Sequence, residues 1–171
     1  TGSTTPEPVA ILRAAAAADV RIRPTFGVKN IDQPARFWNN MRDRTRGRYI
    51  GILDDDNTKF PTFVERLAGY LDAHPDVDMV TCGMLVTDKT GSAREHRLNA
   101  TTTPEIIDDR NTIDGGSLLI RREAFERCGY YPLDIRTNED WAFLRRAIPI
   151  LKVVHLDEIH VGYWFHGEAR S

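Results

Sequence analysis

The chain has 171 residues, of which 41% are hydrophobic and 28% are charged, and its net charge is −2. This composition fits a single globular domain over residues 1–171 and excludes a basic surface for nucleic acid. No apolar run is long enough to cross a membrane, and no segment resembles a secretory signal. Cys82 and Cys128 lack metal-ligand spacing, so we expect buried, reduced thiols in a protein of the cytoplasm or the cytoplasmic membrane face.

Two helices are predicted in the first 47 residues. The first begins at Thr4-Thr5-Pro6-Glu7, where threonine caps precede a proline and a glutamate at capping-box spacing, and it runs to about residue 19. Residues 20–23 alternate apolar and polar side chains, which indicates a strand. The second helix covers about residues 33–46 and ends at Gly47.

A continuous apolar run over residues 49–53 leads into an acidic triplet. Such a run predicts a strand that is buried on both faces of a parallel sheet. The run stops at Asp54-Asp55-Asp56, and Pro61 opens the next helix. The apolar face of that helix is predicted to contain residues 63, 64, 67, 70 and 71.

Shorter elements follow in the second half of the chain. Residues 78–86 and 92–98 are predicted as a strand and its return strand around a turn at 88–91, and residues 99–110 as a polar loop. Gly115-Gly116 precedes a strand at 117–120, a helix at 123–128 and a helix that starts near 137–140. The last strands are expected at 151–155 and 160–165. This order predicts an α/β fold whose sheet is extended by a mixed portion.

The acidic triplet is a candidate metal site. Three adjacent carboxylates repel one another in a cleft, and a divalent cation removes that conflict. Mg²⁺ and Mn²⁺ prefer hard oxygen ligands and commonly share them with substrate phosphates. Along an extended segment Asp54 and Asp56 point to the same side, so both can serve one metal–diphosphate unit. A solvated polar turn is the alternative.

Glu139-Asp140 is a candidate catalytic pair. A carboxylate at this position can take the proton from an acceptor hydroxyl as a general base. The alternative is a helix cap, because Thr137 and Asp140 have capping-box-like spacing. Trp141 offers either a flat face to a sugar ring or a contact with the core.

Two further segments are candidate binding residues. Asp114-Gly115-Gly116 allows close approach of the backbone to a ligand, although a simple loop before a strand explains it equally well. The imidazole of His166 can complete a metal shell or bind a phosphate, although a lone histidine near a chain end usually does neither.

Together, five segments resemble the family 2 glycosyltransferases of the GT-A fold. They are residues 48–57 (RYIGILDDDN), 60–67 (FPTFVERL), 115–125 (GGSLLIRREAF), 138–141 (NEDW) and 163–167 (YWFHG). Their order and spacing over about residues 45–167 are more specific than any one of them. The resemblance implies a Rossmann-like mixed sheet flanked by helices. It also implies that the family's first β-α-β elements lie before residue 1, so that a partner chain or another segment completes the sheet.

The resemblance also implies roles for these residues. Asp56 would be the direct ligand of Mn²⁺ or Mg²⁺, with Asp54 and His166 beside it. Asp54, Asp55, Arg36 and the segment Asp114-Gly115-Gly116 would face the donor, and Trp141 the acceptor. Asp140 would be the base, with Glu139 next to it. The implied reaction is inverting transfer from a nucleoside-diphosphate sugar, by default a UDP-sugar, to a hydroxyl of a sugar, lipid-linked or small-molecule acceptor.

Two other functions fit parts of the sequence. The segment 54–58 also resembles the first motif of haloacid-dehalogenase-type phosphatases, in which Asp54 would be the nucleophile, Asp56 an acid/base and Mg²⁺ the cofactor. Asp108-Asp109 would then be the downstream acidic pair. A non-catalytic glycosyltransferase fragment that functions only with a partner segment is the second alternative.

Overall fold

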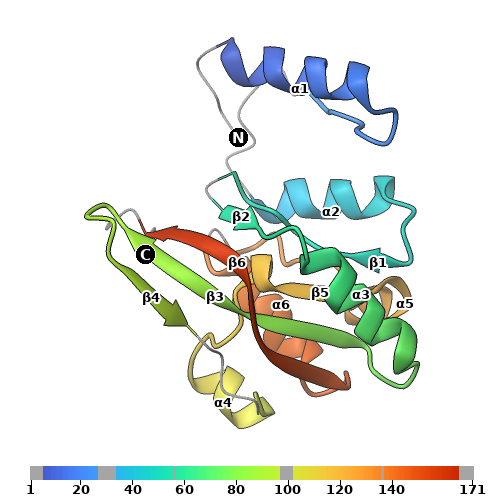
Figure 1. Ribbon diagram of the computed structural model, residues 1–171. Coiled ribbons are helices and arrows are strands. Elements are labelled where there is room, and N and C mark those ends of the chain that lie inside the picture. Colours follow the sequence, from blue (N-terminus) through green and yellow to red (C-terminus); the bar gives the residue numbers. More distant parts are fainter. Residues whose placement is uncertain (1–5, 27–33, 56, 97–101, 136, 166–171) are drawn as a thin grey trace.

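A six-stranded mixed sheet organises the computed structural model, which describes residues 6–26, 34–55, 57–96, 102–135 and 137–165 (Figure 1). The strand order is β1-β5-β3-β6-β2, with β4 beside β3. The sheet confirms the predicted α/β class. The strands are β1 (Tyr49–Ile50), β2 (Asn57–Lys59), β3 (Met79–Asp88), β4 (Ala93–His96), β5 (Leu118–Arg121) and β6 (Val153–Phe165).

The strand that precedes the acidic triplet differs from its prediction. β1 contains only Tyr49 and Ile50 and pairs antiparallel with β5. Beyond Ile50 the chain leaves the sheet, and Leu53 is 54% exposed. The run is nevertheless apolar because Tyr49 packs on one side of the sheet, whereas Ile50 and Ile52 pack on the other. Among the described strands, only β3 and β6 pair in parallel.

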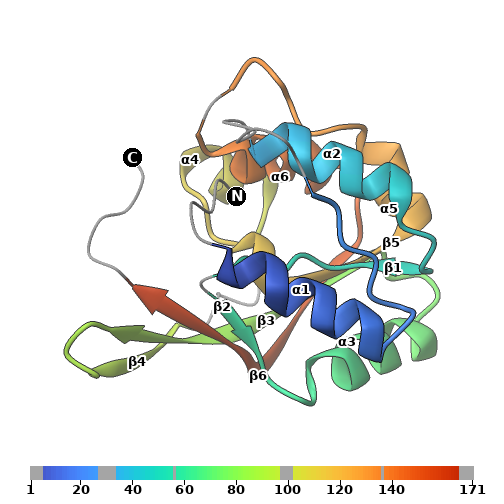
Figure 2. The same ribbon diagram turned by 90° about the horizontal axis from the view of Figure 1, so that it is seen from above.

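Helices cover both faces of the sheet. Figure 2 shows α2, α5 and α6 on one side and α3 on the other. Their bounds are α1 (Glu7–Ala18), α2 (Pro34–Arg44), α3 (Phe63–Ala73), α4 (Pro104–Asp109), α5 (Arg122–Cys128) and α6 (Glu139–Ala147), and a short 3₁₀ helix, η1 (Gly115–Ser117), precedes β5. The described residues contain no helix with the length and apolarity of a membrane span.

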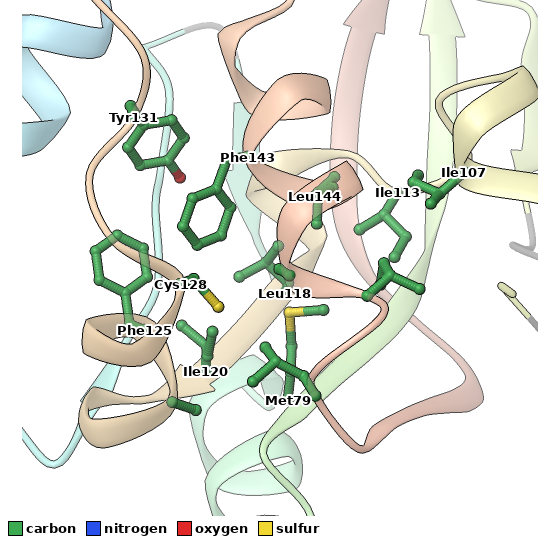
Figure 3. Close-up of a cluster of buried hydrophobic side chains, with 14 of the residues drawn as sticks. Met79, Ile107, Ile113, Leu118, Ile120, Phe125, Cys128, Tyr131, Phe143 and Leu144 are labelled. Carbon is green, nitrogen blue, oxygen red and sulfur yellow. The ribbon is translucent and has the colours of Figure 1, made fainter. Parts of the chain in front are cut away.

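Alternating strand residues separate two hydrophobic clusters. Met79 and Ile120 face α5 and α6, where Phe143 stacks on Tyr131 with ring centroids 4.7 Å apart (Figure 3). Val80 and Leu119 face α3 on the opposite side. Cys82 and Cys128 are free and buried, as predicted.

Several predicted elements are wrong or incomplete. Residues 20–23 form no strand, because the Asp19 side chain accepts hydrogen bonds from Arg21 and closes a turn. The predicted loop at 99–110 contains α4, whose N-cap Thr103 accepts a hydrogen bond from the N–H of Ile106 and whose first residue is a proline. Val64, predicted in the core, is exposed.

The helix α1 confirms the predicted first helix but contributes no buried residue. Its predicted threonine caps, Thr4 and Thr5, lie outside the described residues. Figure 1 shows α1 beyond α2, at one end of the molecule. Two of its apolar residues, Ile11 and Leu12, are 61% and 43% exposed.

Candidate functional site

The first part of the site is the acidic turn between β1 and β2. Asp54 is half-buried and Asp55 is exposed, whereas Asp56 lies outside the described residues. The backbone N–H of Asn57 donates to the Asp54 carbonyl at 3.3 Å, which closes the turn. β2 then pairs with the end of β6, with Asn57 opposite Tyr163. This pairing was not predicted, and it anchors the acidic turn to the sheet.

The second part is the segment that leads through η1 into β5. The Asp114 carboxylate accepts the N–H of Gly116 at 2.7 Å, and its carbonyl accepts the Ser117 hydroxyl at 2.8 Å. A methyl group on Gly116 would lie 2.9 Å from Asp114 Oδ1 and 3.3 Å from Asn57 Nδ2. The glycine at position 116 is therefore required by neighbours within the protein, and its approach to a ligand stays a prediction.

The third part is the start of α6. Its N-cap is Asn138, with φ 59° and no side-chain capping bond, so the capping-box alternative for Thr137 and Asp140 is wrong. Instead, the Asp140 carboxylate accepts the N–H of Trp141 at 2.7 Å and the Asn111 amide at 3.3 Å.

Geometry and charge bring these three parts together. A methyl group on Gly115 would lie 3.9 Å from Cβ of Asp140, so η1 and α6 are neighbours. Burial raises the pKa of the Tyr131 hydroxyl, and Asp140, Glu139 and Asp54 raise it further. Three of the predicted site carboxylates therefore raise the pKa of one buried phenol.

The Glu139 carboxyl is itself partly withdrawn from water. Its burial raises its pKa above the ordinary value, and the neighbouring Asp140 adds to the increase. The pair at the start of α6 therefore consists of two carboxyls in different surroundings: Glu139 is disfavoured as an anion, whereas Asp140 accepts two hydrogen bonds.

Two other predicted binding residues lie at the edge of this arrangement. Trp141 donates its indole N–H to the Ile107 carbonyl at 2.5 Å and packs against the first hydrophobic cluster. The core role that the sequence allowed is therefore present, and a contact with the acceptor stays a prediction. Arg36 is exposed in the first turn of α2, and its donor role also stays a prediction.

The oxygen donors of this region suit a hard divalent cation. Asp54, Asp55 and Asp114 supply carboxylates, and Asn57 adds a buried amide oxygen that has no hydrogen-bond partner among the described residues. Within the part of the chain that the structure describes, no group of three or more His, Cys, Asp or Glu side chains is placed to hold a metal. The predicted ligands Asp56 and His166 lie outside that part.

Sequence reasoning missed Asn57, Lys59 and Asn111. Asn57 and Lys59 alternate on β2 and therefore point to the same side. Asn57 and Lys59 could have been recognised from their position directly after the acidic triplet. The segment Asn57-Thr58-Lys59 has no apolar alternation, however, so it was not predicted as a strand. Asn111 is recognisable only from its contact with Asp140.

The curled mixed sheet, with its acidic segments close together, is that of the GT-A class of glycosyltransferase folds. The family model described as "Glycosyl transferase family 2" matches residues 1–129, more than half of the chain. The chain therefore belongs to this family, which confirms the resemblance.

Individual relatives agree with this family. The Bacillus subtilis protein named "Putative glycosyltransferase EpsE" is 27% identical over 100 residues, which cover 58% of this chain and 36% of EpsE. S. aureus TarS 1–349 in complex with UDP-GlcNAc superposes with a TM-score of 0.77 at 16% identity, over 96% of this chain and 47% of TarS.

The mannosyltransferase PcManGT from Pyrobaculum calidifontis, in complex with GDP-Man and Mn²⁺, superposes with a TM-score of 0.59 at 18% identity, over 99% of this chain and 46% of that one. The chain thus spans less than half the length of these proteins. At these identities the structural likeness shows the fold.

The phosphatase alternative does not agree with these findings. The family match assigns the chain to the glycosyltransferases. Asp108, which would belong to the phosphatase acidic pair, instead forms a surface ion pair with Arg145 at 2.7 Å.

Proposed function

We propose that this chain carries the diphosphate- and acceptor-facing part of a glycosyltransferase that moves a sugar from a nucleoside-diphosphate sugar to an acceptor hydroxyl. One observation carries the proposal: the η1 segment and the start of α6 meet where Gly115 lies beside Asp140. Asp54, from the distant acidic turn, raises the pKa of the same buried Tyr131 hydroxyl as Glu139 and Asp140 do. Relatives support the donor class, since TarS was solved with UDP-GlcNAc and PcManGT with GDP-Man.

Asp54, together with Asp56 and His166, would hold a Mn²⁺ or Mg²⁺ ion. When bound, such an ion stabilises the negative charge that develops on a departing diphosphate. The Asn57 amide oxygen, which has no hydrogen-bond partner within the described part of the chain, would add a neutral oxygen ligand. The Mn²⁺ in the PcManGT complex supports this cofactor.

Asp140 would act as the general base. Its two hydrogen bonds, from Asn111 and from the backbone of Trp141, fix the carboxylate next to Gly115. A carboxylate held in this way can accept the acceptor's proton as the hydroxyl oxygen attacks the sugar. Glu139, whose pKa is raised by its burial and by the neighbouring Asp140, would hold a proton more readily than an exposed glutamate. We assign an inverting, direct displacement.

A further segment would complete the donor site. β1 lies at the end of the strand order, and Leu53 just beyond it is 54% exposed. A β-α-β segment or a partner chain that pairs with β1 would bury these groups and remove the open edge.

Calorimetry with UDP and GDP, each with Mn²⁺ and with a chelator, tests the proposal. We expect binding that depends on Mn²⁺, and Asp54→Asn is expected to weaken it. The mass in solution should be measured in parallel, because it reports whether a second copy is present. A folded chain that binds no nucleoside diphosphate under any of these conditions would support the non-catalytic fragment instead.

A further inference from the structure

Lys59 is half-buried below the acidic turn, on the side of the sheet that faces α3. Its Nζ lies 3.7 Å from the centroid of the Phe63 ring. A methyl group on Gly51 would lie 3.4 Å from the same Nζ, so the ammonium lies directly under the chain that leads from β1 to Asp54. The ammonium therefore lies between the Phe63 ring and the chain that leads to Asp54. It is on the same side of β2 as Asn57, whose amide and the Asp114 carboxylate both lie next to Gly116.

Burial and the neighbouring acidic groups have opposite effects on the pKa of Lys59. Burial lowers the pKa of Lys59 to about 8, and Cys82, Asp54 and Asp114 counteract this effect. The two carboxylates belong to the acidic turn and to the η1 segment, which are the two halves of the proposed donor site. A half-buried lysine whose charged form two such carboxylates favour can compensate their charge.

We propose that Lys59 is a positioning residue of the donor site. Its ammonium supplies a protein-borne positive charge that holds the Asp54 and Asp114 carboxylates close together and lies against the diphosphate of a bound donor. The contact with the diphosphate rests on the proposed function. The coupling to the two carboxylates is a property of the folded chain and can be measured without any ligand.

A packing role alone makes a different prediction. If Lys59 served only to cover the Phe63 ring, Lys59→Met would leave the stability of the protein nearly unchanged. Methionine keeps the unbranched apolar stem of lysine and lacks only its charge. The neighbouring carboxylates would then not influence the effect of that substitution. Charge compensation, in contrast, makes the effect of Lys59→Met depend on whether Asp114 is charged.

A double-mutant cycle of thermal unfolding separates these two roles. The full chain is compared with Lys59→Met, Asp114→Asn and the double variant at neutral pH. We expect Lys59→Met to be less destabilising, or more stabilising, in the Asp114→Asn background than in the wild type. Equal shifts in the two backgrounds would overturn the proposal.

Controls are available within the same chain. Lys89 is exposed in the turn between β3 and β4, so Lys89→Met should shift the melting temperature equally in both backgrounds. If Asp114→Asn fails to fold, the same cycle with Asp54→Asn replaces it, since Asp54 also faces Lys59.

Calorimetry with UDP in the presence of Mn²⁺ tests the diphosphate contact. Loss of a hydrogen bond to a charged group predicts that Lys59→Met binds UDP about tenfold more weakly or worse. Lys59→Arg, which keeps the charge, should stay within about threefold of the wild type. Unchanged UDP binding by Lys59→Met would overturn this half. A third outcome separates the two proposals: the double-mutant cycle shows coupling, but the wild type does not bind UDP. This result would support the positioning role of Lys59 and contradict the nucleotide-sugar function.

Discussion

Gly116→Ala tests how the donor segment is built. The new methyl group would lie 2.9 Å from Asp114 Oδ1, closer than a carbon and an oxygen approach each other, and 3.3 Å from Asn57 Nδ2. The carboxylate must then rotate away and give up its 2.7 Å hydrogen bond from the Gly116 N–H. A hydrogen bond to a charged group contributes about 1.5–3 kcal/mol. Since Gly116 does not have a positive φ, the cost is steric and no backbone strain is added.

In a chain of this size, about 2 kcal/mol lowers the melting temperature by roughly 4–8 °C. We expect this decrease for Gly116→Ala in a thermal unfolding experiment. Gly115→Ala is the matched control, because its methyl group would meet only Cβ of Asp140 at an ordinary 3.9 Å. A Gly116→Ala variant that melts with the wild type, or a Gly115→Ala variant that melts equally low, would refute the reasoning.

Three further predictions concern the base, an ion pair and the core. Asp140→Asn should lower release of nucleoside diphosphate from the donor by about 10²–10⁴-fold and leave UDP binding intact; unchanged turnover would contradict the assignment. Hydrogen bonds from Arg66 and His160 lower the pKa of Glu158 to about 2. A lowered folded-state pKa stabilises the protein above the ordinary value, and this stabilisation is lost as the pH falls through the folded value. Glu158→Gln should therefore cost about 1 kcal/mol at pH 7, after allowance for its partial exposure, and melting curves should converge with the wild type between pH 4.5 and 2. A difference in melting temperature that stays constant from pH 4.5 to pH 2 would show that the charge of Glu158 is not the cause. Phe143→Ala should cost about 3–5 kcal/mol in denaturant unfolding, because the ring is 1% exposed; a loss below about 1 kcal/mol would show that the core refills the space.

The sequence allowed most helices to be predicted because their signals are local. The helix that follows Pro61 and the helix closed by Gly129 are present within a few residues of their predicted bounds. Gly129 has φ 78°, which explains why a glycine ends the second of these helices. The turn at residues 88–91 and its return strand are also local signals, and both are confirmed.

Features that depend on distant partners could not be predicted in this way. β2 is a strand only because β6 offers it a partner 100 residues later in the chain, and its residues Asn57-Thr58-Lys59 carry no apolar pattern. The same applies to Asn111, whose role depends on the position of Asp140. Of the predicted site, Gly115 lies beside Asp140, and Asp54, Glu139 and Asp140 act on the pKa of the same buried Tyr131. The roles of these residues, and the positions of Asp56 and His166, stay predictions.

The irregularity in the middle of β6 determines which side chains reach the acidic turn. Cys82 of β3 lies opposite Leu156, Gly83 opposite Ile159 and Met84 opposite Val161, so β6 gains three residues over two steps of β3. An odd insertion exchanges the two faces of a strand: before it, even-numbered residues of β6 face α3, and after it odd-numbered ones do. The β2 partners Val161 and Tyr163 therefore face α3, whereas an uninterrupted β6 would turn both of them to the opposite side of the sheet.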